Sequence, residues 1–233
     1  MASGPERFSF LLVGEEHLRA QSFDALEERG AFLWGQARRD GYVGYVDRDA
    51  FWPTGGALPT HWVKAIRVFA FTEPSIKARA VGPFTLNALV HVLAEEGAFS
   101  ASNDGLWFWT AHLAPIGAFE PDPAAVAERF VGAPYLWGGR TSVGLDCSAL
   151  VQQALYACGR ACPRDTDQQA LLGRPVDRGE PARGDLVCWP GHIGMMLDEA
   201  RLIHANAFHM CVAVEPADAA IARIGPPTAL RRA

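Results

Sequence analysis

The chain has 233 residues, of which 49% are hydrophobic and 20% are charged, and its net charge is −5 at pH 7. This composition is typical of a soluble globular protein and excludes a disordered, collagen-like or coiled-coil chain. The acidic balance argues against a nucleic-acid partner, and no apolar run approaches the roughly 18 residues that a membrane span needs. The length favours two or three modules over a single compact core.

The start of the chain and its cysteines predict the cellular compartment. The first residues, MASGPERFSFLLVGEEH, carry charges where a signal peptide needs a long apolar run. The five cysteines are irregularly spaced, which does not indicate a disulfide framework. Both features predict a cytoplasmic protein with reduced thiols. The acidic balance and the lack of a long apolar run predict that it binds neither nucleic acid nor a membrane.

An internal repeat marks the first half of the chain. The segment LEERGAF at residues 26–32 is echoed by AEEGAF at residues 94–99, and each copy is followed by a cluster of glycines and aromatic residues. Both copies contain short β-branched or aromatic runs broken by Gly, Asp, Asn and Pro, a pattern that favours small antiparallel barrels. The sequence therefore predicts two related all-β modules, over residues 1–53 and 60–117. The alternative is a chance similarity between two glycine-rich hairpins.

Two breaks separate the modules. Residues 53–59, PTGGALP, form a predicted linker between the first and the second module. The first module has 26 residues before its Glu-Glu pair and the second has 32 counted from Val63, so the first is expected to lack an opening strand. A second break falls at residues 120–123, after which residues 124–131 predict a helix with a proline near its start. The third module is therefore expected over residues 122–233.

A cysteine begins a predicted helix in the third module. From Tyr135 the sequence reads YLWGGRTSVGLDCSALVQQALYACG, a glycine-rich loop followed by apolar residues at helical spacing. Cys147 is therefore expected at or beside a helix start, where unpaired N–H groups and the helix dipole lower the pKa of a thiol and can bind an oxyanion. Most cysteines before an apolar helix are buried hydrophobes, but Asp-Cys-Ser after a glycine loop favours a nucleophile.

Two strand-like segments supply the histidines that a thiol nucleophile needs as proton shuttles. His192 in GHIGMML and His204 in RLIHAN are twelve positions apart, which allows an antiparallel hairpin with residues 198–200 near its turn. This hairpin would set the two imidazoles side by side, so that His204 orients His192. His209 is a second choice for the orienting role, because it follows the predicted strand.

The cysteines and histidines also allow a zinc interpretation. Three residues separate Cys158 from Cys162, and three residues separate Cys188 from His192. Ordinary zinc sites combine a C-x2–4-C pair with an H-x3–5-H pair, a combination that these residues do not form, and Cys162 and Cys188 are expected in a loop and a strand respectively. The sequence therefore predicts no metal and no other cofactor.

Five motifs follow one another in the third module, namely YLWGG, LDCSALVQ, GDLVCW, GHIGMM and RLIHAN. Their combination and order make residues 122–220 resemble the NlpC-type cysteine peptidases, papain-like enzymes that cut cell-wall peptides. The resemblance implies Cys147 as nucleophile, His192 as base and His204 as the third polar residue. Ala149 stands where the family usually has glycine, a change that a helix tolerates. The β repeats resemble bacterial SH3-like domains. We therefore expect an α+β chain in which a papain-like cysteine peptidase domain follows two small all-β SH3-like barrels.

The resemblance also implies a substrate. It indicates a γ-D-glutamyl-L-diamino acid endopeptidase that acts on murein tripeptides or tetrapeptides with a free N-terminal L-alanine. It assigns Asp146, Ser148 and Tyr135 to the substrate side, with Asp146 as the anionic partner of the alanine ammonium. From its position alone, Asp146 is equally well explained as a helix N-cap.

The first SH3-like module is expected to contribute to the same pocket. The resemblance suggests one acidic and one aromatic residue, and Glu15 and Tyr42 fit these roles, with Glu16 and Tyr45 as chemically equal neighbours.

A cytoplasmic enzyme of this kind would recycle imported wall peptides. Two alternatives remain, namely an amidase or acyltransferase on the same scaffold and a non-catalytic protein that binds wall peptides.

Overall fold

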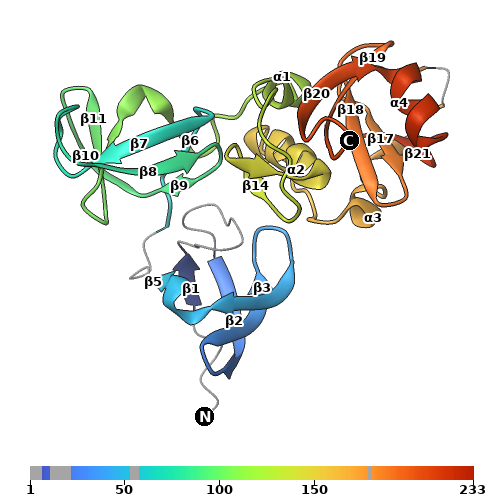
Figure 1. Cartoon of the computed structure of the whole chain (residues 1–233). Helices are drawn as coiled ribbons and strands as arrows, with labels where there is room; N and C mark the ends of the chain where they lie inside the picture. Colours follow the sequence, from blue (N-terminus) through green and yellow to red (C-terminus); the bar gives the residue numbers. More distant parts are fainter. Residues whose placement is uncertain (1–6, 11–21, 53–57, 178–179) are drawn as a thin grey trace. The chain divides into compact units, whose positions relative to one another are not determined.

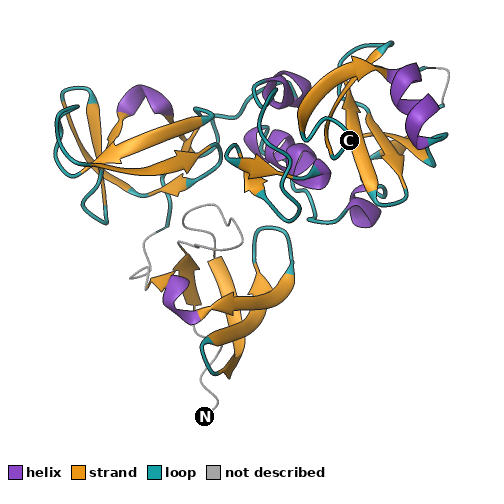
Figure 2. Cartoon of the chain, viewed as in Figure 1, coloured by secondary structure: helices purple, strands orange, loops and turns teal. Residues whose placement is uncertain are grey.

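The computed structural model divides the chain into two compact units, residues 1–119 and 120–233, and each is described here by itself (Figure 1). The structure describes residues 7–10, 22–52, 58–177 and 180–233. Sheets make up most of the secondary structure and helices are few (Figure 2), which confirms the predicted α+β class. Within these described ranges, none of the helices has the length and apolar character needed to cross a membrane.

The first unit opens with an antiparallel sheet in the strand order β4-β3-β2-β1-β5. Strands β2 and β3 form a hairpin that turns at Gly30, whose φ of +63° favours glycine, and a bulge lies between Ala25 and Glu27. Strand β1 pairs with β2 and β5, and residues 11–21 between β1 and β2 lie outside the described residues, so the expectation that this module lacks an opening strand stays a prediction. The elements are β1 (Arg7–Phe10), β2 (Ser22–Arg29), β3 (Phe32–Ala37), β4 (Val43–Asp47), η1 (Arg48–Ala50) and β5 (Phe51–Trp52).

Two further sheets complete the first unit, in the orders β10-β11-β12-β7-β8 and β13-β6-β9. Buried residues alternate with exposed ones along β7, and Phe108 on β12 is fully buried in the same core. The elements are β6 (His61–Val63), β7 (Arg67–Phe71), β8 (Ala80–Thr85), β9 (Leu89–Val90), β10 (Val92–Glu96), β11 (Phe99–Ser102), β12 (Trp107–Trp109), η2 (Thr110–His112) and β13 (Leu113–Pro115).

The two copies of the sequence repeat have the same local structure. The hairpin of β10 and β11 turns at Gly97, with a φ of +58°, and has a bulge between Val92 and Ala94, as the hairpin of β2 and β3 has in the first sheet. In both sheets a third strand, β4 or β12, pairs with the second strand of the hairpin. The linker predicted at residues 53–59 lies mostly outside the described residues, and the module boundaries stay predictions.

The second unit begins with the helix predicted after the second break. Asp122 caps this helix by accepting a hydrogen bond from the Ala124 N–H at 2.9 Å, and Pro123 occupies its first position. The helix ends at Glu128 instead of residue 131, because the chain turns towards Gly132, which has a φ of +81°.

A six-stranded sheet in the order β16-β21-β17-β18-β19-β20 forms the body of the second unit. Helix α2 packs against β18 and β19 on one side and against α1 on another (Figure 1), which is why its residues are apolar nearly all round and all are buried. The elements are α1 (Pro123–Glu128), β14 (Arg140–Thr141), β15 (Gly144–Leu145), α2 (Cys147–Ala157), α3 (Thr166–Gln169), β16 (Arg174–Pro175), β17 (Leu186–Trp189), β18 (His192–Met196), β19 (Arg201–Asn206), β20 (Cys211–Pro216), α4 (Ala217–Ile224) and β21 (Ala229–Arg232).

Candidate active site

Cys147 is the first residue of α2, as the sequence predicts. Asp146 is the N-cap, and its Oδ1 accepts a hydrogen bond from the Ala149 N–H at 2.9 Å, so the N-cap interpretation of Asp146 is confirmed. The backbone N–H groups of Ile193, Ser148 and Cys147 itself lie close enough to the Cys147 thiol to lower its pKa. Since Ile193 directly follows His192 in β18, this contact brings the thiol to the beginning of the strand that carries the first histidine.

The pKa of the Cys147 thiol differs from what the sequence predicts. Burial is the largest influence and raises the pKa of Cys147, and the negative charge of Asp146 raises it further. The N–H groups at the helix start lower this pKa, as expected, but they do not outweigh burial of a residue that is only 6% exposed. The resting side chain is therefore a neutral thiol, which needs a base to become a nucleophile.

The glycine-rich loop before α2 permits close backbone packing around the helix cap. Gly138 has a φ of +80°, and its N–H donates to Asp146 Oδ2 at 3.0 Å. At Gly139, an added Cβ would lie 2.5 Å from the backbone oxygen of Gly144. A side chain at Gly139 would thus displace the loop that supports the N-cap, whereas at Gly138 the left-handed backbone alone favours glycine.

The two predicted histidines meet in the predicted hairpin. Strands β18 and β19 are antiparallel, with Met196 opposite Leu202, and His192 Nε2 lies 2.8 Å from His204 Nδ1. A Cβ at Gly194 would lie 3.3 Å from the Cβ of His204, so glycine leaves room for the buried imidazole beside it. The hairpin therefore places the two rings side by side, as expected from the spacing in the sequence.

Burial sets the charge of both histidines. Burial is the main cause that lowers the pKa of His192 to about 4, and the neighbouring His204 and Arg223 lower it further. Burial also lowers the pKa of His204, which is fully buried, although its hydrogen bond to Glu215 opposes this. Both imidazoles are thus neutral at pH 7, and His192 can accept a proton.

An arginine that the sequence analysis did not single out completes the surroundings of the helix cap. Arg164 is buried and donates from Nη1 to Asp146 Oδ1 at 2.9 Å and from Nη2 to Asp146 Oδ2 at 2.6 Å. Its Nη1 also lies 2.6 Å from Ser148 Oγ. With Gly138, Ala149 and Ser148 as further donors, both carboxylate oxygens of Asp146 are occupied. The charge of Asp146 is therefore compensated within the protein.

Buried polar side chains hold the segment that carries Arg164 against α2. From α2, Gln152 and the Tyr156 hydroxyl both donate to the Cys162 backbone oxygen at 3.1 Å. From α3, Gln169 donates to the backbone oxygens of Ser148 and Pro163 at 2.9 and 2.8 Å. These bonds explain how an arginine 18 positions after Asp146 reaches it.

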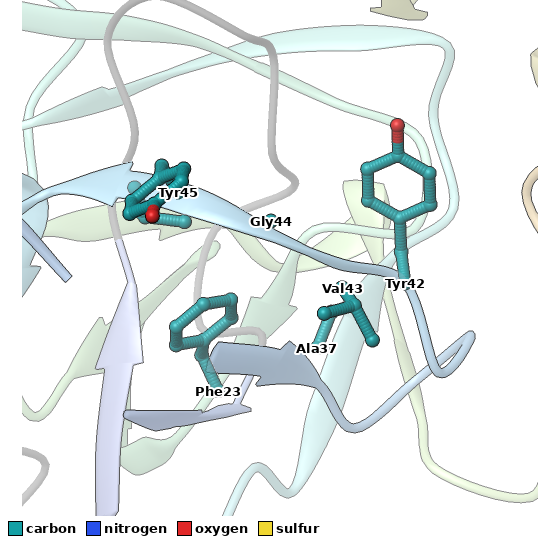
Figure 3. Close-up of a pocket in the computed structure, with 7 residues that line it drawn as sticks. Phe23, Ala37, Tyr42, Val43, Gly44 and Tyr45 are labelled. Atoms are coloured by element: carbon teal, nitrogen blue, oxygen red, sulfur yellow. The ribbon is translucent and has the colours of Figure 1, made fainter. Parts of the chain in front are cut away.

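The remaining predicted substrate residues have different environments. Tyr135 lies in the loop before α2, where burial is the main cause that raises the pKa of its phenol and the Asp146 carboxylate raises it further. Tyr42 is exposed in the first unit and lines a pocket of about 250 Å³ (Figure 3). Glu15 lies outside the described residues. Because the two units are each described alone, the contribution of Glu15 and Tyr42 to the site stays a prediction.

A second set of potential metal ligands lies behind the histidine pair. Ligand atoms of His204, His209 and Glu215 all lie within 4.8 Å of one another, and no other such group is found among the described residues. Arg223, however, donates to both carboxylate oxygens of Glu215. Because its positive charge lies where a cation would bind, the arrangement favours an ion pair over a metal site. All five cysteines are free thiols.

Comparison with known families agrees with this geometry. The sequence model of the NlpC/P60 family matches residues 132–221, the segment that contains Cys147, His192 and His204. Residues 132–221 form an NlpC/P60 domain. The model of the bacterial dipeptidyl-peptidase SH3 domain matches residues 16–51 of the first unit. Both resemblances predicted from the sequence are therefore confirmed at the level of domains.

Relatives of the NlpC/P60 domain are named as peptidases. A "probable endopeptidase" of Mycobacterium tuberculosis is 34% identical over 91 residues, which are 38% of this chain and 24% of that protein. A "gamma-D-glutamyl-L-lysine dipeptidyl-peptidase" of Bacillus cereus is 27% identical over 127 residues, 51% of this chain and 38% of that protein. One of the same name from Bacillus subtilis is 32% identical over 84 residues, 33% of this chain and 28% of that protein. The matches thus span well under half the length of these relatives.

A solved structure shows the fold. The crystal structure of an NlpC/P60 family protein from Bacillus cereus superposes with a TM-score of 0.80 over 91% of this chain and 79% of that chain, at 19% sequence identity. The predicted fold class, an SH3-like part followed by an NlpC/P60 domain of papain-like fold, is therefore confirmed.

Proposed function

We propose that this chain is a cysteine peptidase that cleaves the bond between γ-D-glutamate and an L-diamino acid in short murein peptides. The observation that carries the proposal is the arrangement of a buried thiol at the start of α2 beside a strand whose His192 contacts His204 at 2.8 Å. The two Bacillus relatives named for γ-D-glutamyl-L-lysine peptides support the substrate class. The expected substrate is a tripeptide or tetrapeptide with a free N-terminal L-alanine.

The proposed reaction uses His192 twice. The neutral imidazole takes the Cys147 proton on the ring nitrogen that does not contact His204, and the sulfur attacks the γ-carbonyl carbon to form a tetrahedral oxyanion. The N–H groups at the start of α2 are suited to stabilise this oxyanion. As the C–N bond breaks, the imidazolium donates its proton to the leaving amine. A water molecule that His192 deprotonates then hydrolyses the thioester and restores the thiol.

Asp146, Ser148 and Tyr135 are proposed to bind the alanine end of the substrate. Because Arg164 compensates the charge of Asp146, this carboxylate would not be left unpaired by a substrate without an ammonium group. We therefore expect a moderate preference for the free amine, of the size of one hydrogen bond to a charged group, about 10- to 100-fold in kcat/KM.

The proposal is tested with three peptides whose products are identified by mass. L-Ala-γ-D-Glu-diaminopimelate is expected to yield the dipeptide of alanine and glutamate together with diaminopimelate. Its N-acetylated form should react about 10- to 100-fold more slowly, because it lacks the ammonium. The isomer linked through the α-carboxyl group should stay intact.

Other outcomes of this experiment favour the alternatives. Release of an acyl product transferred to an added amine would indicate an acyltransferase, and cleavage of simple amides with equal efficiency would indicate a general amidase. Tight binding without any cleavage would indicate a wall-peptide binding protein.

We further propose that the peptidase acts in the cytoplasm on imported wall peptides, since a preference for free L-alanine suits short fragments better than intact murein.

The lowered pKa of His192 predicts how the reaction depends on pH. His192 accepts a proton only while it is neutral, and its pKa is lowered to about 4. We expect kcat/KM to stay high as the pH falls through 6.5 and to decrease only as it falls through about 4. The measurement is the initial rate on the free γ-linked peptide from pH 3.5 to 8, with circular dichroism at each pH to exclude unfolding. A decrease centred near 6.5 would show that His192 is not held neutral by burial.

A further inference from the structure

The hydrogen bonds that link His192 to His204 continue beyond His204 to two further side chains. The Nε2 atom of His204, on β19, lies 2.6 Å from Oε1 of Glu215 on the neighbouring strand β20. Arg223 on α4 donates from Nη1 to Glu215 Oε2 at 2.9 Å and from Nη2 to Oε1. The side chain of His204 is fully buried and that of Glu215 is 10% exposed. Two consecutive elements, β20 and α4, thus support the second histidine on the side away from His192.

The strand register explains why these side chains meet. Leu202 is opposite Glu215 and His204 is opposite Ala213 in the β19–β20 pair. Since side chains two positions apart share a face of a strand, Glu215 lies diagonally across from His204 on the same face. Arg223 lies on the helix that directly follows β20 and comes back over this face.

The protonation states along the series follow from what each group can donate. The hydrogen bonds from Arg223 are the main cause that lowers the pKa of Glu215, so its carboxylate is ionised and can only accept. His204 must therefore carry its proton on Nε2, which leaves its Nδ1 as an acceptor. The 2.8 Å contact between His204 Nδ1 and His192 Nε2 then requires His192 to donate from Nε2. The Nδ1 atom of His192 is left without a proton, as a base requires.

We infer that Glu215 is a positioning residue that selects the tautomers of His204 and, through it, of His192, and that Arg223 holds Glu215 in place. This inference rests on the proposed function, in which His192 accepts the thiol proton. Without Glu215, His204 can instead carry its proton on Nδ1 and donate to His192 Nε2. The proton of His192 then moves to Nδ1, and the base is lost in that fraction of molecules.

The test measures ring proton positions directly. In the full-length protein with 15N-labelled histidine, at pH 7, we expect the nitrogen chemical shifts of both His192 and His204 to show protonation on Nε2. Single substitutions of each histidine assign the signals. In Glu215→Ala both rings should show a mixture of the two tautomers, whereas Asp218→Ala, which removes an exposed carboxylate from the first turn of α4, should leave the spectrum unchanged.

Kinetics on the γ-linked peptide provide the second measurement. Glu215→Ala should lower kcat by about 10- to 100-fold, by analogy with the loss when the carboxylate behind a metal-bound histidine is removed, with little change in KM. Glu215→Gln keeps an oxygen that accepts from His204 and should recover part of the loss. It also serves as the test variant if Glu215→Ala does not fold.

The outcomes separate this inference from the proposed function. If the wild type shows His204 protonated on Nδ1, or if the Glu215 variants keep both rings protonated on Nε2 as in the wild type and keep the wild-type kcat, the inference is wrong. If the wild type cleaves none of the peptides but the tautomers shift as expected, the proposed function is wrong, while the role of Glu215 in orienting the two rings is supported.

Discussion

Replacing Cys147 by alanine, or His192 by alanine, is expected to lower kcat for the γ-linked peptide by about 10⁶-fold, to the level of the reaction without a nucleophile. The two losses should not add in the double variant, since the thiol and its base act as one unit. His204→Ala should have a milder effect and lower kcat by about 10⁴-fold, because this residue only orients the base and stabilises its charged form. Peptide release is followed by mass after single and double substitution.

The other cysteines provide matched controls. Cys158 lies at the other end of α2, and burial is the main cause that raises the pKa of its thiol to about 11. Cys158→Ala should therefore keep the wild-type kcat. If instead Cys158→Ala or Cys188→Ala were as damaging as Cys147→Ala, with unchanged circular dichroism, Cys147 would not be the nucleophile.

Replacing Arg164 by methionine is expected to have the largest effect on stability. The side chains of Arg164 and Asp146 are 7% and 10% exposed, so removal of the arginine leaves an uncompensated carboxylate inside the protein. Breaking a buried pair in this way costs about 3–5 kcal/mol. The measurement is native-state hydrogen exchange of the α2 amides, which reports the opening free energy of the second unit alone.

Two further variants test the reason for this loss. Arg183 also contacts two carboxylates, those of Asp122 and Glu128, but its side chain is 40% exposed, so Arg183→Met should cost at most about 1 kcal/mol for each contact. Adding Asp146→Asn to Arg164→Met should recover part of the stability, because no buried charge remains. A loss for Arg164→Met no larger than that for Arg183→Met would show that the ion pair contributes little.

The parts of the site that could be predicted from the sequence depend on local patterns. Helix α2 follows from apolar residues at helical spacing after a capping aspartate, and the hairpin of His192 and His204 follows from two alternating segments separated by a short polar turn. In each case the residues that decide the structure lie within a few positions of those they position. The hairpins of the internal repeat were predictable for the same reason, with a glycine at each turn.

The parts that could not be predicted depend on tertiary contacts. Arg164 is 18 positions from Asp146 and reaches it only because buried glutamines hold its loop against α2. Glu215 is 11 positions from His204, and its role depends on the register of β19 and β20 and on Arg223 of α4. In a sequence, neither residue differs from a solvated charge. The acidity of Cys147 was misjudged because a helix start is visible in a sequence, whereas the degree of burial is not.

The most direct test of the central claim is covalent labelling with a substrate analogue. A dipeptide of L-alanine and D-glutamate with a chloromethyl ketone at the γ-position places its electrophile where the scissile carbonyl would lie. We predict one adduct per chain, located on Cys147 by peptide mapping, slowed by excess γ-linked peptide and greatly slowed in His192→Ala. Labelling of Cys158, Cys162, Cys188 or Cys211 instead, or no labelling of a protein that cleaves the peptide, would contradict the assignment of Cys147 as the nucleophile.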